Sequence, residues 1–140
     1  MSDLDHAQSL LEMAMGDLNA LRGMMMATDA SSALFSDEVF GFHAQQAAEK
    51  CLKAWIAALG RSYPRTHDLM ALIDTLADEG TDTSSLNSLV DLTPFAVQYR
   101  YEFLDTDDDE LDRGSVLQEI QSLYERVVGI IDELNLNTHL

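Results

Sequence analysis

The sequence predicts an all-α fold, an antiparallel up-down bundle of four long helices with one shorter helix. Apolar residues recur at steps of three and four along most of its 140 residues, which is the period of an amphipathic helix. It contains no alternating apolar and polar run of useful length and no Asn-Gly or Asp-Gly hairpin signal. Because each apolar stripe needs a partner face, we expect residues 1–140 to form one helical domain.

The first two expected helices are separated by a polar segment, residues 28–36. Ser36, followed by two acidic residues, has the pattern of an N-cap with negative charge at the positive end of the helix dipole. The second helix is expected to run to about Leu59, and Gly60 suits the position after a helix C-terminus. The apolar stripe of the first helix consists of Leu4, Ala7, Leu11, Ala14, Leu18, Leu21 and Met25.

The third and fourth helices are expected after short connections. Thr66 is placed to cap the third helix, which Gly80 closes, and residues 81–88 read as a polar connection. Thr93 and Pro94 have the cap-then-proline order that begins a fourth helix, expected to pass through Tyr99 and Phe103. The third helix carries Leu69, Leu72, Ile73 and Leu76, and the last helix carries Val116, Ile120, Leu123, Val127, Ile130 and Leu134.

The charge of the chain is strongly negative, with 25 acidic residues against 8 Lys and Arg and a net charge of −17. This balance repels a phosphate backbone, which argues against nonspecific coating of nucleic acid. The start of the chain lacks the features of a secretory signal, and its apolar stretches fall short of the ~20 residues that span a bilayer. We therefore expect a cytoplasmic protein without membrane insertion.

The second helix carries a polar ridge beside an apolar face. His43, Gln46, Lys50 and Lys53 fall within roughly 80° of arc, and the two lysines are the only ones in the protein. Two lysines one turn apart, with an amide and an imidazole beside them, could hold a phosphate through charge-assisted hydrogen bonds. The alternative is an ordinary solvated face with salt bridges to acidic residues. The neighbouring face is formed by Ala44, Ala48, Cys51, Trp55 and Leu59.

Three ordered motifs resemble the HEPN family, the nucleotide-binding domains of higher eukaryotes and prokaryotes. They are FHAQQAAEKCLKAWIAALG at 42–60, THDLMALI at 66–73 and YRYE at 99–102. The resemblance implies a helical bundle, a homodimer, and a gene beside that of a minimal nucleotidyltransferase. Some members of the family are metal-independent RNA-cleaving toxins of toxin-antitoxin pairs, and others bind only nucleotides or partner proteins.

The ribonuclease branch of this family carries an Arg, then four to six residues, then a His. Arg61 and His67 satisfy that spacing. The Arg would neutralise the scissile phosphate, and the His would move the proton during attack by the ribose 2′-hydroxyl. In the family this pair normally begins a later helix. The corresponding region here is YRYE at 99–102, and Arg100 is not followed by a histidine at that spacing. The alternative role of His67 is to complete a helix start or dock a loop.

The main hypothesis from the sequence is an accessory protein that binds a nucleotide or a phosphate and acts with a separately encoded minimal nucleotidyltransferase. The alternatives are a metal-independent endoribonuclease toxin that acts on RNA and a non-catalytic dimeric interaction module, to whose dimer contact Met24, Met25 and Met26 would contribute. No cofactor is expected. In the main hypothesis the anion is held by Lys50, Lys53, His67 and Arg100, with His43 and Gln46 as polar neighbours.

Two further features are expected to be structural. The acidic segment 105–112 fails as an EF-hand, because Glu110 stands where a glycine is required and Val116 where the bidentate glutamate is required. Weak cation binding and a solubilising connector both remain open for this segment, and no metal site is predicted. Cys51 lies on the packing face without a histidine at helical spacing, which indicates a buried structural thiol.

Overall fold

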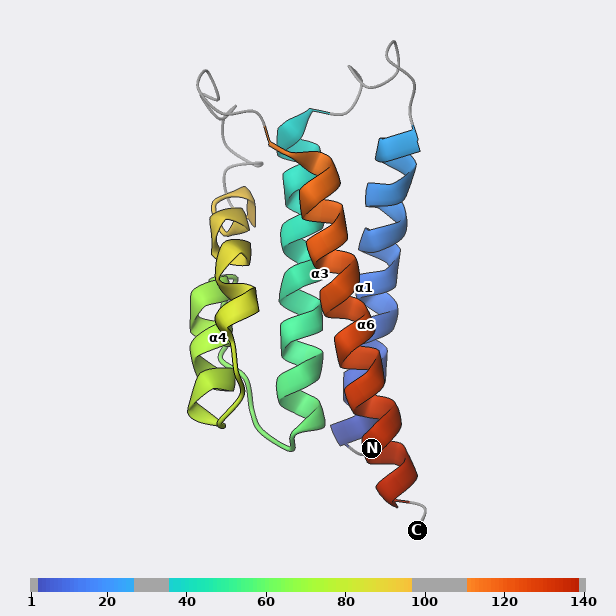
Figure 1. Cartoon of the computed structure of the whole chain (residues 1–140), viewed down its shortest axis with the longest axis vertical. Helices are drawn as coiled ribbons and strands as arrows, with labels where there is room; N and C mark the ends of the chain where they lie inside the picture. The colour runs from blue at the N-terminus through green and yellow to red at the C-terminus, as the bar shows by residue number, and fades with distance from the viewer. Residues whose placement is uncertain (1–2, 27–35, 97–110, 139–140) are drawn as a thin grey trace.

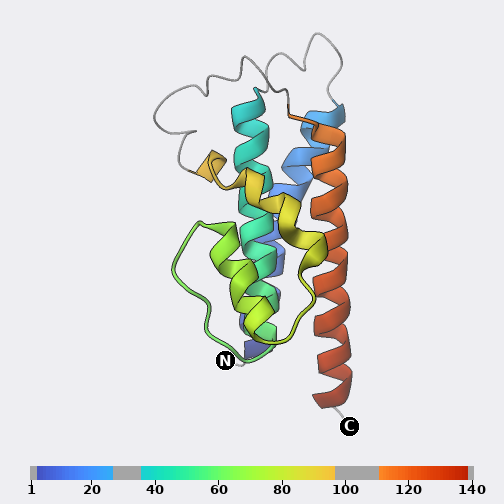
Figure 2. The same ribbon diagram turned by 60° about the vertical axis from the view of Figure 1, so that its left-hand side comes forward.

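The computed structural model describes residues 3–26, 36–96 and 111–138, and these ranges contain helices and no strand (Figures 1 and 2). The all-α class predicted from the sequence is confirmed. Residues 95 and 96 are helical, and the rest of the fourth long helix expected there lies outside the described residues. The elements in chain order are α1 (Asp3–Met26), α3 (Asp37–Ala58), α4 (Leu69–Asp78), the 3-10 helix η1 (Ser84–Leu92) and α6 (Arg113–Thr138).

Helix α3 lies at the centre of the molecule. It packs most extensively against α1, contacts α6 on the same side, and meets α4 and η1 on the other (Figure 1). Helix α1 runs antiparallel to both α3 and α6. Small side chains allow the helices to approach closely, and those buried along α3 are Ala44, Ala47, Ala48, Cys51, Ala54, Ala57 and Ala58.

The ends of α3 and the closing glycines agree with the expectation from the sequence. The hydroxyl oxygen of Ser36 accepts a hydrogen bond from the backbone N–H of Val39 at 3.2 Å, which satisfies one of the free donors at the helix start. Gly60 and Gly80 follow α3 and α4 with positive φ angles of 78° and 90°. A side chain would strain the backbone in this left-handed conformation.

Three local expectations are corrected by the structure. Asp68 caps α4 in place of Thr66, whose hydroxyl instead accepts from the N–H of Asp68. At the end of α1 the buried methionine is Met24, whereas Met25 is 41% exposed. The expected connection 81–88 contains the start of η1, because leucines spaced by three residues match the 3-10 period and bury one face against α3 and α4. These leucines are Leu86, Leu89 and Leu92.

Within the described ranges, no helix combines the length and the hydropathy that crossing a bilayer would require.

Candidate functional site

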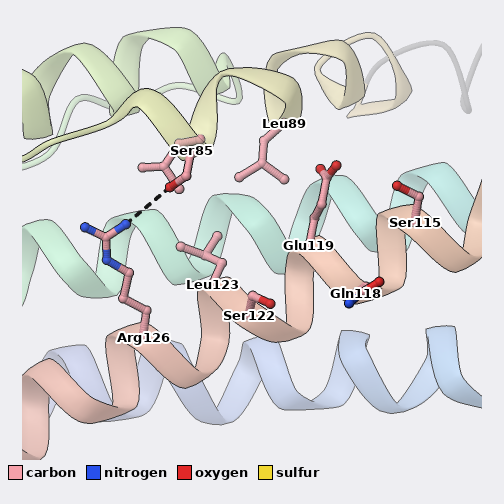
Figure 3. A pocket seen from close by; sticks show the side chains of 9 residues that line it. Ser85, Leu89, Ser115, Gln118, Glu119, Ser122, Leu123 and Arg126 are labelled. Carbon is pink, nitrogen blue, oxygen red and sulfur yellow. Dashed lines mark hydrogen bonds between the residues drawn. The ribbon is translucent and has the colours of Figure 1, made fainter.

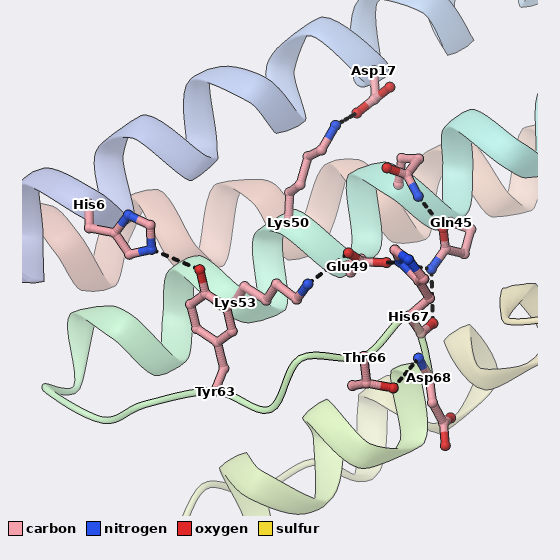
Figure 4. A network of polar contacts seen from close by, with 11 residues as sticks. His6, Asp17, Gln45, Glu49, Lys50, Lys53, Tyr63, Thr66, His67 and Asp68 are labelled. Atoms are coloured by element: carbon pink, nitrogen blue, oxygen red, sulfur yellow. Dashed lines mark hydrogen bonds and ion pairs between the residues drawn. The ribbon is translucent and has the colours of Figure 1, made fainter. Parts of the chain in front are cut away.

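The polar ridge of α3 is defined as His43, Gln46, Lys50 and Lys53. Lys50 reaches Asp17 on α1, and Lys53 lies beside Tyr63 of the linker 59–68 that leads to α4 (Figure 4). All four side chains are half-buried. Their spacing places them on one face of α3, as the sequence predicted, but the face is not a solvated one. Lys50 pairs with a carboxylate on α1, and Lys53 pairs with a carboxylate on α3 itself.

Asp17 on α1 neutralises the part of the ridge that faces that helix. Its Oδ2 accepts a hydrogen bond from Lys50 Nζ at 2.7 Å, and its Oδ1 lies 3.0 Å from Nδ1 of His43. The Asp17 side chain is only 12% exposed, so this bridge between α1 and α3 is screened less by solvent than an ordinary surface pair.

Glu49 holds together the other part of the ridge and the linker. Lys53 Nζ donates to its Oε2 at 2.8 Å, Gln45 Nε2 donates to its Oε1 at 2.9 Å, and His67 Nδ1 lies 2.8 Å from the same Oε1. Burial raises the pKa of Glu49, and the hydrogen bonds from Lys53, Gln45 and His67 outweigh this effect, so its pKa is lowered overall. The carboxylate is therefore ionised at neutral pH and can only accept hydrogen bonds.

His67 is held at two points. Because the ionised Glu49 accepts only, the contact requires the proton of His67 on Nδ1. The fully buried Gln45 donates to the backbone carbonyl of His67 at 3.0 Å, while its own carbonyl accepts from Gln46 at 2.7 Å. The side chain of His67 is nevertheless 64% exposed. The ring is thus fixed through one nitrogen and open to solvent.

Tyr63 completes this region from the linker. Its hydroxyl lies 2.8 Å from Nε2 of His6, and the two rings stack with centroids 5.9 Å apart. The ammonium of Lys53 lies 5.4 Å from the centroid of the Tyr63 ring, within the range of a cation–π contact. The linker is therefore tied to both α1 and α3.

Arg61 and His67 contact different carboxylates. Arg61 forms an ion pair with Glu79, directly after α4, and its side chain is 63% exposed. His67 is held by Glu49 instead. Arg100 and residues 105–110 of the acidic segment 105–112 lie outside the described residues.

The carboxylates were the part of this site that sequence reasoning missed. Gln45, Glu49 and Lys53 are spaced by four residues, which predicts mutual contact along one helix. The signal that could have revealed Glu49 is its position among alanines on a packing face, where an unpaired charge is costly. Asp17 carries no such local signal, because its partners come from another helix.

Within the part of the chain that the structure describes, no three His, Cys, Asp or Glu side chains are grouped so as to hold a metal ion.

The fold and this region define a helical domain whose central helix carries paired cations and carboxylates beside a linker histidine. The model of the HEPN domain family matches residues 7–134, nearly the whole chain. The chain belongs to the HEPN domain family. Comparison with curated proteins and with solved structures gives no significant match.

Proposed function

We propose that this HEPN domain binds the phosphate group of a nucleotide or of a nucleic-acid terminus, and that it acts with a separately encoded minimal nucleotidyltransferase. One observation carries the binding part of the proposal. Lys53 and His67 meet on the two oxygens of one buried carboxylate, and the His67 ring remains 64% exposed. A bound phosphate would lie against this exposed edge.

The chemistry of the two groups suits an oxyanion. Lys53 has three N–H donors, of which Glu49 takes one, so further donors remain for phosphate oxygens. Arg65 is exposed in the same linker, two residues before His67. Lys50, His43 and Gln46 continue the ridge towards α1 as polar neighbours, and Arg100 is proposed as a further anion contact.

The negative charge of the rest of the protein favours a small ligand over a long polynucleotide. At a net charge of −17, the field of the molecule repels each additional phosphate of an extended backbone. One nucleotide or one terminal phosphate meets the cations of the linker with the least repulsion.

The binding proposal is tested by calorimetric titration with AMP, ATP and inorganic phosphate. Lys53→Ala and His67→Ala should each weaken binding by about tenfold or more, the usual loss when a charged hydrogen bond is removed. Arg22→Gln is the control. It removes one positive charge from α1, where Arg22 contacts Asn19 and not the linker. Equal binding by the parent and both variants, or no binding by the parent, would contradict the proposal.

The partner is tested separately by gene context and by copurification. We expect a small nucleotidyltransferase encoded next to this gene, and a stable complex when the two chains are coexpressed. A solitary gene and two chains that elute independently would argue for a protein that works alone.

A second function, a metal-independent endoribonuclease, is favoured by the orientation of His67. A buried carboxylate that holds one imidazole nitrogen leaves the other to accept or donate a proton, which is the arrangement of a general base. RNA cleavage should then survive chelation and disappear in His67→Ala. Cleavage that chelators abolish, or full activity in the variant, would exclude this function.

A third function, a dimeric interaction module, draws support from the exposed methionines of α1. Met13, Met25 and Met26 are 52%, 41% and 83% exposed. Sedimentation equilibrium should give a dimer that Met26→Glu weakens. A monomer at about 100 µM, a concentration at which even weak specific association is detectable, would count against it.

A further inference from the structure

A cavity of about 320 Å³ lies between η1 and α6, and none of its walls comes from the α3 ridge or the linker (Figure 3). Its floor is apolar, because Leu86, Leu89 and Leu123 are buried there. Its rim is polar, with serine hydroxyls contributed by both helices. An apolar floor with a few placed polar groups is the usual composition of a small-molecule site.

Arg126 provides a positive group at one end of the cavity. Its guanidinium lies over the ring of Trp55, 4.5 Å from the centroid, and donates a hydrogen bond to the hydroxyl of Ser85 at 3.4 Å. Among the described residues it forms no ion pair with a carboxylate, although its positive charge makes a small contribution to the lowered pKa of the exposed Asp82, after the hydrogen bonds from Ser84. The stacking and the serine contact orient the guanidinium, and its remaining N–H groups are available to a carboxylate.

Glu119 provides a negative group further along the cavity. The hydroxyl of Ser88 donates to its Oε2 at 3.0 Å, which leaves the acceptor capacity of Oε1 for a ligand. Glu119 and Arg126 are seven residues apart on α6, which corresponds to about 10 Å along the helix. Figure 3 shows Arg126 at one end of the cavity, Leu89 and Leu123 between it and Glu119, and Ser115 beyond Glu119.

We propose that this cavity binds a small zwitterion of about dipeptide size. The ligand carboxylate lies on Arg126, its ammonium lies on Glu119, and its short apolar body covers the leucines. The rise of about 10 Å along α6 between the two residues leaves room for a ligand whose charges are a few ångströms apart. A zwitterion also suits the molecule as a whole, since a neutral ligand is not repelled by the net charge of −17.

Trp55, whose ring contacts the guanidinium of Arg126, permits a direct test, because it is the single tryptophan of the protein. Alanyl-alanine is titrated while the fluorescence of Trp55 is recorded, beside N-acetylalanine, which lacks the ammonium, and alaninamide, which lacks the carboxylate. The dipeptide should give a saturable change with a Kd below about 10 mM, and each one-ended analogue should bind about tenfold more weakly.

Variants test the two charged groups that are proposed to hold the ligand. Arg126→Gln should remove dipeptide binding, and Glu119→Gln should bring the affinity for the dipeptide down to that for N-acetylalanine. The controls are Arg22→Gln and Glu125→Gln, which remove the same charges outside this cavity, and circular dichroism verifies the fold of every variant. Dipeptide binding no tighter than that of either analogue, unchanged binding in both site variants, or no saturable change overturns the proposal.

Discussion

Glu49 is the residue on which the linker and the central helix depend. It is 5% exposed and accepts hydrogen bonds from Lys53, Gln45 and His67, three residues that lie on two different segments. A buried carboxylate without these donors would be strongly unfavourable, so the four side chains stabilise the fold only as a set.

The lowered pKa of Glu49 predicts a loss of stability in acid. Its ionised form is preferred by the folded protein, so its contribution is complete above the unfolded value of 4.5 and is lost as the pH falls through the lower folded value. Glu49→Gln should cost on the order of 2 kcal/mol at pH 7, and less as the pH falls below 4.5. Urea unfolding at pH 7, 4.5 and 3 measures this.

The control for this prediction is Glu125→Gln, which removes an exposed carboxylate from α6. It should change stability by less than about 0.5 kcal/mol. A pH dependence in Glu49→Gln that is parallel to that of the parent protein would show that Glu49 is not linked to folding.

Cys51 illustrates the opposite case, a buried group that is kept neutral. Burial, with a smaller contribution from the negative charge of Asp17, raises the pKa of its thiol to about 12, which agrees with the structural thiol predicted from the sequence. Only about one thiol in ten thousand is then ionised at pH 8, and the thiolate is the reactive form. An aromatic disulfide reagent should react slowly with the native protein and rapidly in urea. Complete reaction of the native protein within seconds would contradict this environment.

At the scale of elements, Phe95 packs closely against α3 because residue 41 of that helix is a glycine. A Cβ atom added to Gly41 would lie 2.6 Å from Cε1 of Phe95, so a methyl group cannot be accommodated without movement of the ring. Three other glycines of the long helices, Gly16, Gly23 and Gly129, have no neighbour within 4 Å of such an atom.

This contrast predicts opposite effects of the same substitution. Gly41→Ala should destabilise the protein by about 1 kcal/mol, because overpacking costs about 1–3 kcal/mol and the better helix propensity of alanine offsets about 1 kcal/mol. Gly129→Ala, in the middle of α6, should stabilise it by up to about 1 kcal/mol. Urea denaturation compares the two variants, and destabilisation by both would point to a cause other than contact with Phe95.

At the scale of the whole molecule, the net charge of −17 on 140 residues opposes folding through self-repulsion. Salt shortens the distance over which charges act, from about 30 Å at 0.01 M to below 8 Å above 0.15 M. The buried pairs at Asp17 and Glu49 are screened less than the exposed acidic residues.

We therefore expect sodium chloride to raise the Tm by several degrees, about the shift that 1 kcal/mol produces in a chain of this size. A non-ionic solute at equal osmolality serves as the control. A Tm that falls as salt is added would mean that the ion pairs outweigh the general repulsion.

Much of the fold could be predicted because helix formation depends on spacing within a single segment. The steps of three and four in α1 and α6, the cap at Ser36 and the glycine after α3 are local patterns, and each is found in the structure. The 3-10 helix η1 was missed, because leucines three residues apart also occur in ordinary connections and only their burial distinguishes the two.

The site could be predicted only in part, because local spacing shows which residues share a helix face but not which residues of other segments they contact. The spacing of the α3 ridge identified the face that carries the lysines and His43. The partners of those side chains come from elsewhere, since Lys50 and Asp17 are 33 residues apart and His67 and Glu49 are 18 residues apart. No pattern within one helix encodes such distances.

The sequence by itself determined that this chain is a helical HEPN domain, because periodicity, caps and family motifs are properties of contiguous residues. The tertiary structure alone decided which carboxylate neutralises each cation and which side of His67 faces solvent. Those features depend on how separate helices pack, and packing is settled by the burial of all the apolar stripes together.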